Sequence, residues 1–450
     1  MKDMTEGKPV RLILNFAFPL LLGNLFQQTY NMADAAIVGQ FLGADALAGV
    51  GASSSIQFLV LGFCLGTCTG FCIPVAQRFG AKDYGAMRKY IYNSILLTGS
   101  FGLLLTVMLA IFCPGILHLL STPDNIFRDA YYYLLIIFLG IPCTLLYNLT
   151  AGILRAVGDS RTPFIFLVVS TILNIFLDLF CILVLQWGVA GAAIATIASQ
   201  GVSGILCLIY VIRRFDFLHL SEKDRVFSVQ FMKNLVLMGF PTGLQFSITA
   251  IGSMVLQSAN NSLGSIYISG FTAAMKIKQL MMSPFDAIST GVATFCSQNL
   301  GAGKGERIKT GIRRGVLIAA SYGAAAGILL ILFGRGMSLI FLKSDQTAIL
   351  DAAGRYLSAI GIFFWELGFL NVLRMTIQGL GYSGAAVFSG VAEMFARIFV
   401  SVIFVPIAGY TAVTLADPAA WTAACLYVIP LCVICVKKAL PSNPSPLRRQ

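Results

Sequence analysis

Charged residues are scarce in this sequence, and their scarcity excludes a soluble globular fold. Asp, Glu, Lys and Arg make up 11% of its 450 residues, whereas hydrophobic residues make up 57%. Soluble proteins carry about 25% charged residues, which their water-facing surfaces require. Apolar runs of about twenty residues instead recur along nearly the whole chain, and a helix of that length crosses the hydrocarbon core of a bilayer. The composition therefore predicts an all-α polytopic membrane protein surrounded by lipid.

Histidine and the motifs of nucleotide and metal chemistry are equally scarce. The chain has 2 histidines, and the glycine-rich residues 301–305 lack the spacing of a phosphate-binding loop. Cys432 and Cys435 form a single CxxC without the second pair that a zinc site needs. We therefore expect no metal centre, no cofactor, and neither enzymatic nor ATP-driven activity.

Most of the 11 cysteines lie inside apolar runs. Cys64, Cys68 and Cys72 recur at every fourth position. This spacing aligns small side chains on one helical face, so we interpret them as packing residues. The first apolar run contains Pro19 and continues into Asn24, beyond the length of a signal sequence. We expect this run to stay in the mature protein as its first helix.

Charges and Gly/Pro clusters divide the apolar runs into twelve expected transmembrane helices. Their approximate ranges are residues 12–38, 46–74, 90–113, 130–153, 163–185, 188–212, 234–260, 268–295, 312–333, 353–379, 385–408 and 418–436. With a cytoplasmic N-terminus, most Lys and Arg fall in cytoplasmic segments, and only Arg128, Arg335, Lys343 and Arg355 fall on the outer side. This asymmetry predicts a multi-pass protein of the inner membrane with both termini in the cytoplasm. It also accounts for the formal charge of +12 without a nucleic-acid partner.

The two halves of the sequence repeat each other in order. Pro19 aligns with Pro241, residues 77–82 with 298–304, Tyr133-Leu134 with Tyr356-Leu357, and residues 156–160 with 379–383. Six helices per half is an even number, so both halves have the same orientation in the membrane.

The repeat predicts two pseudo-symmetric six-helix lobes around a central cavity. We expect an N-lobe over residues 1–212, a cytoplasmic linker over 213–233 and a C-lobe over 234–450 with a short basic cytoplasmic tail. Two such lobes can rock about a central site, which favours an alternating-access transporter over a pore or a scaffold.

Two acids stand out in the first half. A charged side chain in the middle of a membrane helix costs roughly 2.5–3.5 kcal/mol or more, so it needs a partner or a task. Asp34 and Asp178 are the deep acids of the first half, and no Lys or Arg lies in the core of any helix expected in that half. Asp34 shares a helical face with Gln27 and Asn31, and Asn174 precedes Asp178 by one turn. We expect both polar faces to point into the lobe, where the acids can bind a proton or hold a bare cation such as Na+.

The second half combines deep acids with deep bases. Glu393 and Arg397 are spaced for an ion pair along one helix, which is either structural or functional. Glu366 and Lys276 lack local partners; they either meet across the lobe or contact substrate. The other charged side chains within its expected helices are Asp286, Lys278 and Arg374.

Several of these motifs together resemble the multidrug and toxic compound extrusion (MATE) transporters over nearly the whole chain. The resemblance rests on Pro19 with residues 24–27, residues 31–34, Gln77 with Gly80-Ala81, residues 298–303 with Arg307, and Asn174 with Asp178. It implies twelve helices in two six-helix lobes, and export driven by a proton or sodium gradient.

The resemblance also implies a cation site inside the N-lobe. The residues that match this site are Asp34, Asn174, Asp178 and Thr196, and those that match or join its polar cavity are Gln27, Asn31 and Asn148. Protonation of the acids is expected to rearrange the first helix, which bends near Pro19 because proline removes a backbone hydrogen bond.

The sodium-coupled branch of the family places acids in helices 7 and 10 of the C-lobe. In this sequence helix 7 offers Gln257, Asn260 and Asn261, whereas helix 10 carries Glu366. Both H+ and Na+ therefore stay open as the coupling ion.

We expect a cation-coupled antiporter that exports small amphipathic or cationic organic compounds by alternating access and acts as a monomer. The alternative is a flippase for lipids or lipid-linked oligosaccharides. A flippase of that kind would need further helices and a strongly cationic cavity, for which the first half supplies no cation.

Overall fold

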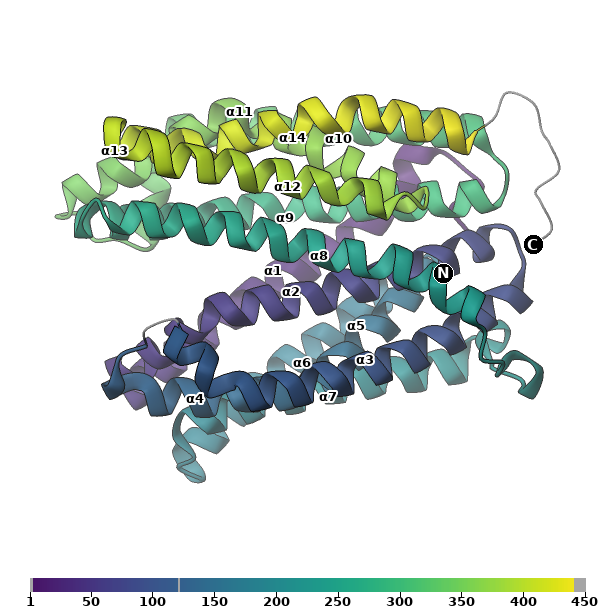
Figure 1. Ribbon diagram of the computed structural model, residues 1–450, viewed down its shortest axis with the longest axis horizontal. Coiled ribbons are helices and arrows are strands. Elements are labelled where there is room, and N and C mark those ends of the chain that lie inside the picture. Colours follow the sequence, from purple (N-terminus) through teal and green to yellow (C-terminus); the bar gives the residue numbers. More distant parts are fainter. Residues whose placement is uncertain (1–2, 120–121, 441–450) are drawn as a thin grey trace. The chain divides into compact units, whose positions relative to one another are not determined.

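The computed structural model describes residues 3–119 and 122–440, and the regular structure in these ranges is helical, without strands. The α-helices are α1 (Pro9–Leu42), α2 (Ala44–Gly80), α3 (Tyr84–Leu119), α4 (Asp124–Leu139), α5 (Ile141–Ala156), α6 (Arg161–Leu179), α7 (Gly188–Arg214), α8 (Val229–Asn261), α9 (Ser265–Gly301), α10 (Gly305–Met337), α11 (Thr347–Gly379), α12 (Ser383–Phe399), α13 (Val405–Ala408) and α14 (Tyr410–Ala439) (Figure 1). The predicted basic tail from residue 441 onward lies outside the described residues.

Ten helices in the described ranges are long and apolar enough to cross a membrane, and α4 with α5 makes an eleventh span bent by 45°. This confirms the prediction of an all-helical membrane protein. The 37-residue helix α9 is not among these spans. Lys276, Lys278 and Asp286 lie near its middle and lower its hydropathy.

Two expected helices differ from the structure at identifiable residues. The single helix expected over 130–153 is wrong, because the chain breaks between α4 and α5 at Gly140, two residues before Pro142. Glycine and proline together favour such a break. The helix expected from residue 418 begins earlier, at Tyr410, and runs through Pro418.

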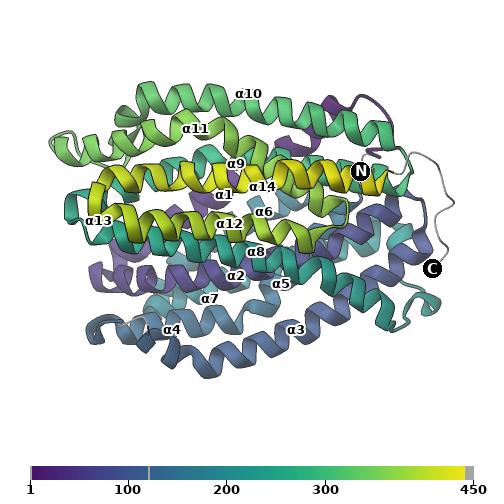
Figure 2. The same ribbon diagram turned by 45° about the horizontal axis from the view of Figure 1, so that its top comes forward.

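The repeat is visible in an unusual helical detail. α6 is followed by a π-helical segment, Phe180–Val184, and α12 is followed by another, Val400–Phe404. Such segments are rare and occur mostly at functional sites. The helices on either side of the second π-helical segment, α12 and α14, lie side by side in both views (Figures 1 and 2).

The chain divides into two compact units. Unit 1 contains residues 18–79 and 83–247, and unit 2 contains residues 3–17, 80–82 and 248–440. The first helix of each half therefore belongs to both units: α1 changes unit directly before Pro19, and α8 changes unit after Ser247. The lobe boundaries expected from the sequence stay a prediction.

Within unit 2, the segment before α1 is fixed to the end of α9. The Met4 amide donates to Gln298 Oε1 over 2.9 Å, and Asn299 Nδ2 donates to the Met4 carbonyl over 3.1 Å. The Arg307 guanidinium donates to the Gly7 and Met4 carbonyls and to Asn299 Oδ1. These bonds satisfy main-chain groups that would otherwise be left unpaired beside the first turn of α1.

Within unit 1, the segment between α7 and α8 is fixed to α3. Arg88 Nε lies 2.7 Å from Asp224 Oδ2, and Asn93 Nδ2 donates to the Val226 carbonyl over 3.0 Å. The Ser221 amide and hydroxyl also donate to Asp224. Burial raises the pKa of Asp224, but the hydrogen bonds from Ser221 and Arg88 outweigh burial, so the pKa of this carboxyl is lowered overall.

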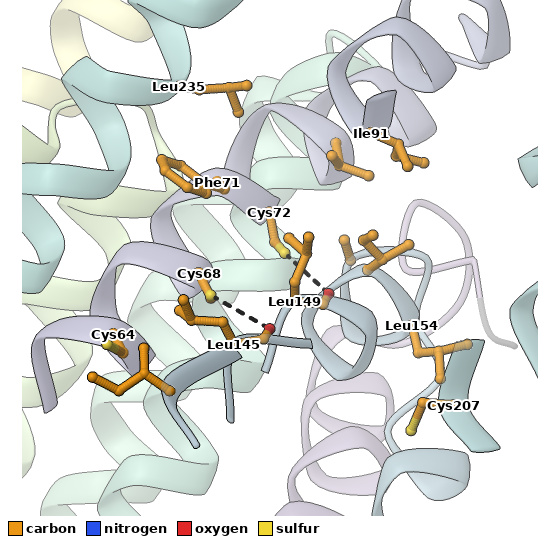
Figure 3. Close-up of a cluster of buried hydrophobic side chains, with 14 of the residues drawn as sticks. Cys64, Cys68, Phe71, Cys72, Ile91, Leu145, Leu149, Leu154, Cys207 and Leu235 are labelled. Carbon is orange, nitrogen blue, oxygen red and sulfur yellow. Dashed lines mark hydrogen bonds between the residues drawn. The ribbon is translucent and has the colours of Figure 1, made fainter. Parts of the chain in front are cut away.

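The cysteines of α2 are packing residues, as predicted, and two of them, Cys68 and Cys72, contact α5 (Figure 3). The thiols of Cys68 and Cys72 lie 4.0 Å from the carbonyl oxygens of Leu145 and Leu149. Cys64 is fully buried on the same face. The packing interpretation is therefore confirmed.

Close packing in unit 1 depends on glycines of α2 and α8. A Cβ added to Gly70 would lie 2.5 Å from the Gly239 Cα and 2.5 Å from the Met238 carbonyl oxygen. Neither backbone atom can move without shifting a helix. Small residues allow membrane helices to approach this closely.

Gly70→Ala is expected to lower the thermal stability of the purified protein, because overpacking costs about 1–3 kcal/mol. The measurement is the midpoint of thermal unfolding in detergent. The matched control is Gly51→Ala in the same helix, where an added Cβ meets nothing within 4 Å. Equal unfolding midpoints for the two variants would contradict the proposed close contact.

Asp224→Asn is expected to be less stable than the wild type at pH 7, and the difference should disappear as the pH falls. Asp224 has a lowered folded pKa, so its stabilisation is present above its unfolded pKa of about 3.9 and is lost as the pH falls through the folded value. Unfolding midpoints between pH 7 and pH 3 measure this. The control is Asp216→Asn, an exposed linker acid with no ion pair in the described ranges. A difference that does not shrink between pH 5 and pH 3 would refute the assignment.

Candidate functional site

Two buried carboxyl groups meet inside unit 1. Asp34 comes from α1 and Asp178 from α6, and their side chains are 8% and 0% exposed. The two groups lie close enough to interact directly. Across the part of the chain that the structure describes, neither forms an ion pair with a Lys or Arg. The prediction that they lie in the interior without a fixed cation is therefore correct.

Neutral polar side chains surround the two acids. Asn174 lies one turn before Asp178 on α6 and is 1% exposed. The Tyr30 hydroxyl of α1 donates to Thr196 Oγ1 of α7 over 3.0 Å. Tyr133 of α4 lies close enough to interact electrostatically with both acids. The structure thus brings Asn174, Asp178, Asp34 and Thr196 to one place, as the sequence analysis expected.

The sequence analysis assigned no role to the two tyrosines. Tyr30 precedes Asp34 by one helical turn, so the sequence spacing already indicated that the two side chains share a helical face. Tyr133 was visible only as a member of the repeat, because Tyr133-Leu134 aligns with Tyr356-Leu357. Each of these aligned tyrosines lies beside a buried acid of its own unit, as the contacts of Tyr356 below show.

Several buried polar atoms at this site lack hydrogen-bond partners. They are Asp34 Oδ1, both carboxyl oxygens of Asp178, and Oδ1 and Nδ2 of Asn174. Buried polar groups are nearly always paired, so unpaired ones need an explanation. Carboxylate, amide and hydroxyl oxygens are the ligands of hard cations, and adjacent carboxyl groups can also share a proton. The residues present fit either ion.

Other residues expected around this site have different surroundings. Gln27 and Asn31 are exposed on unit 1, so they do not share the buried environment of Asp34. Asn148 is half-buried and donates to the Thr144 carbonyl of its own helix over 2.9 Å. A cavity-lining role for these three residues stays a prediction.

Unit 2 contains a continuous chain of buried charges. Lys278 Nζ lies 2.6 Å from Asp417 Oδ2, and Arg397 Nε lies 2.9 Å from Asp417 Oδ1. Arg397 Nη2 lies 3.2 Å from Glu393 Oε2, which confirms the predicted pair. Glu393 also pairs with Arg374. The network joins α9, α11, α12 and α14, and its charged side chains are all buried.

Neutral side chains complete this network. The Tyr356 hydroxyl donates to Asp417, and Lys278 Nζ donates to the same hydroxyl over 3.1 Å. Arg374 Nε donates to Ser389 over 2.9 Å. Each charge therefore has at least one partner of the opposite sign, although three basic groups share two acids and the buried Arg397 Nη1 has no hydrogen-bond partner.

Asp417 was missed by the sequence analysis for a physical reason. An Asp directly before a Pro matches the start of a helix, where Asp caps the first amides and Pro takes the next position. The helix expected over residues 418–436 began directly after this Asp and left it outside the span. In the structure α14 continues upstream, so Asp417 lies inside the helix.

The remaining C-lobe candidates do not form one site. Glu366 accepts a hydrogen bond from Thr422 over 2.8 Å, whereas the Lys276 ammonium lies 5.6 Å from the centre of the Phe341 ring. The hypothesis that Glu366 and Lys276 meet is therefore wrong.

Two amide side chains of α8 were also candidates. Gln257 Nε2 donates to Asn261 Oδ1 over 3.0 Å. Asn260 Nδ2 donates to the Tyr267 carbonyl over 3.3 Å, and its buried Oδ1 has no partner. An ion-binding role for them stays a prediction.

Asp417→Asn is expected to destabilise the protein more than Lys278→Met. Within the described ranges, losing Asp417 removes the only acid paired with Lys278 and one of two paired with Arg397, and breaking a buried pair costs about 3–5 kcal/mol. Losing Lys278 leaves Asp417 bonded to Arg397 and Tyr356. Unfolding midpoints in detergent measure both variants.

The control for this experiment is Asp351→Asn. It breaks an exposed pair with Arg335, which is expected to cost about 0–1 kcal/mol. If Asp417→Asn proves as stable as this control, the network does not stabilise unit 2.

Known proteins share both the sequence pattern and the fold. A family model described as MatE matches residues 19–180 and 241–403, and these segments begin at the two prolines that the repeat aligns. The chain is 31% identical over 392 residues to the "Probable multidrug resistance protein YpnP" of Bacillus subtilis, which covers 84% of each chain. It is 22% identical over 380 residues to a protein of Shewanella oneidensis described as an FAD transporter, with 82% of each chain covered.

Two solved structures are similar over almost their whole length. A MOP superfamily transporter from Pyrococcus furiosus aligns with a TM-score of 0.91 at 21% identity, covering 98% of each chain. An outward-facing multidrug resistance MATE family transporter aligns with a TM-score of 0.90 at 22% identity, covering 98% of this chain and 99% of its own. The matched segments, the relatives and the fold agree: this chain is a multi-pass membrane protein that belongs to the MATE family of multidrug efflux transporters.

Proposed function

We propose that this transporter is a cation-coupled antiporter with twelve membrane spans in two six-helix lobes. The ten apolar helices and the bent α4–α5 pair supply eleven spans, and we assign α9 as the twelfth. α9 has 37 residues, enough to cross a bilayer. Its charges need not disqualify it, because Lys278 is neutralised by Asp417. We further propose that it acts as a monomer in the cytoplasmic membrane with both termini in the cytoplasm.

The coupling ion binds between Asp34 and Asp178 in this proposal. The observation that supports it is the pair of buried carboxyl groups without a basic partner in the described chain. Two adjacent carboxylates cannot both stay ionised in surroundings of low polarity unless a cation joins them. A proton shared by the pair, or Na+ held with oxygens of Asn174 and Thr196, would meet this need.

Ion binding is proposed to act on the transport cycle through α1. Asp34 and Tyr30 hold the outer part of α1 against α6 and α7 within unit 1. The first residues of the same helix belong to unit 2, up to Ala17. A change in how Asp34 is held therefore reaches unit 2 through one continuous helix. Pro19 lies at the change of unit, and its missing hydrogen bond makes bending there easier.

The transported compounds are proposed to be small amphipathic or cationic organic molecules, in line with the relatives described as multidrug resistance proteins. One relative is described as an FAD transporter, so an anionic dinucleotide is the second substrate class to test. The alternative of a lipid flippase has less support, because the described part of unit 1 contributes no basic residue to the buried site.

Asp34→Asn and Asp178→Asn are each expected to abolish gradient-driven efflux of ethidium from proteoliposomes while the protein stays folded. Each substitution removes a charge that has no basic partner in the described chain, so no cation is left unpaired. Asp45→Asn, at an exposed position of α2, serves as the control. Wild-type efflux rates in either site variant would remove the proposed coupling site.

The coupling ion is identified by imposing proton and sodium gradients separately on the wild type. Coupling to H+ predicts ethidium efflux under a pH gradient in sodium-free buffer, whereas coupling to Na+ predicts efflux under a sodium gradient at equal pH. FAD and a fluorescent lipid are tested in parallel. Transport of the lipid alone, without ethidium efflux under either gradient, would replace the antiporter proposal with the flippase.

A further inference from the structure

One face of α9 is polar and exposed, although we assign this helix as a membrane span. Thr272, Lys276, Gln279 and Asp286 are exposed in the structure. At 100° per residue they all lie within about 80° of one another around the helix. The other face carries Lys278 and apolar side chains and is buried. A charged side chain exposed to hydrocarbon would cost roughly 2.5–3.5 kcal/mol or more, so this face is in contact with water rather than lipid.

Asp286 differs from every other acid within the helices of unit 2. Glu393 and Asp417 are each paired with two basic residues, and Glu366 accepts a hydrogen bond from Thr422. The described part of unit 2 offers the Asp286 carboxylate neither an ion pair nor a side-chain hydrogen bond. Arg374 acts on it electrostatically, but that guanidinium is paired with Glu393 and Ser389.

We infer that the exposed face of α9 borders the aqueous substrate path and that Asp286 is the carboxylate that binds the positive charge of an organic-cation substrate. This inference rests on the proposed function as an exporter. The charge of Asp286 complements such a substrate, and its exposure leaves it accessible. The positive charge of Lys276 would repel a cationic substrate, and its ammonium lies over the Phe341 ring.

A neighbouring side chain suits a substrate of variable shape. Met282 lies one turn before Asp286 on α9 and is half-buried. Methionine is flexible and polarisable, and it packs favourably against aromatic rings of different shapes. Asp286 therefore supplies attraction for the charge, while Met282 tolerates variation in the rest of the molecule. Asp286 is a specificity-determining residue in this arrangement, distinct from the coupling acids of unit 1.

The test is the kinetics of ethidium efflux by the full-length protein in proteoliposomes. Asp286→Asn is expected to raise the KM for ethidium about 10-fold, because one charge-assisted contact is lost. The maximal rate should stay within about twofold, since the coupling site is intact. Asp286→Glu keeps the charge and should restore most of the affinity. The matched control is Asp351→Asn, which removes an exposed acid of unit 2 and should leave the KM unchanged.

A second variant tests the same face without changing Asp286. Gln279→Lys places a cation two turns away on the exposed face of α9, and repulsion is expected to raise the KM for ethidium about 3-fold or more. Size-exclusion profiles establish that each variant is folded. If Asp286→Asn does not fold, Gln279→Lys and Asp286→Glu decide the question.

The outcomes separate this inference from the proposed function. If the wild type exports no ethidium under either gradient, the proposed function fails and the inference fails with it. If the wild type exports ethidium and Asp286→Asn keeps the wild-type KM, only the role of Asp286 fails. A lost maximal rate at an unchanged KM would also overturn it, because that pattern marks a coupling residue rather than a binding residue.

Discussion

A bilayer core contains no water to stabilise an ionised side chain, and this constraint determines how the charges of this transporter are arranged. Each charge inside a span must have a partner of opposite sign, exchange a small ion, or reach water. The two units satisfy the constraint differently. In unit 2, Glu393 and Asp417 are held between basic residues. In unit 1, Asp34 and Asp178 face each other without a base in the described chain.

The difference has consequences for how each unit can move. Separating Lys278 from Asp417 would leave a buried ammonium without an acid in the described chain, and separating the other pairs would each remove a buried ionic contact, which makes rearrangement inside unit 2 costly. Unit 1 has no comparable network around its acids, and the polar atoms of Asn174 and Asp178 are unpaired. In the proposed cycle, binding of one small cation changes the hydrogen bonding of unit 1 while unit 2 keeps its internal structure. The unit with unpaired acids is thus the one suited to respond to the ion.

Sequence reasoning identified residues whose environment follows from composition, and it missed those whose environment depends on packing. Asp34 and Asp178 were found because an acid in an apolar run is conspicuous wherever the chain folds. Gln27 and Asn31 share the helical face of Asp34, yet they are exposed, because periodicity gives a direction around a helix but not which neighbours cover it. Asp417 was missed because Asp-Pro resembles a helix start. Tyr133 and Tyr356 were noticed only as a repeated pair, and their proximity to acids emerged from the tertiary structure.

The repeat also explains how a local event can involve both units. The two aligned prolines, Pro19 and Pro241, lie in α1 and α8, the two helices that belong to both units. In each case the segment before the helix is fixed by hydrogen bonds, to the end of α9 for α1 and to α3 for α8. α1 is anchored at its start and carries Asp34 further along. A conformational change at Asp34 must therefore be accommodated between these two points of the helix. A residue without an amide hydrogen is where a helix bends at least cost, and the proposed coupling through α1 assigns that place to Pro19.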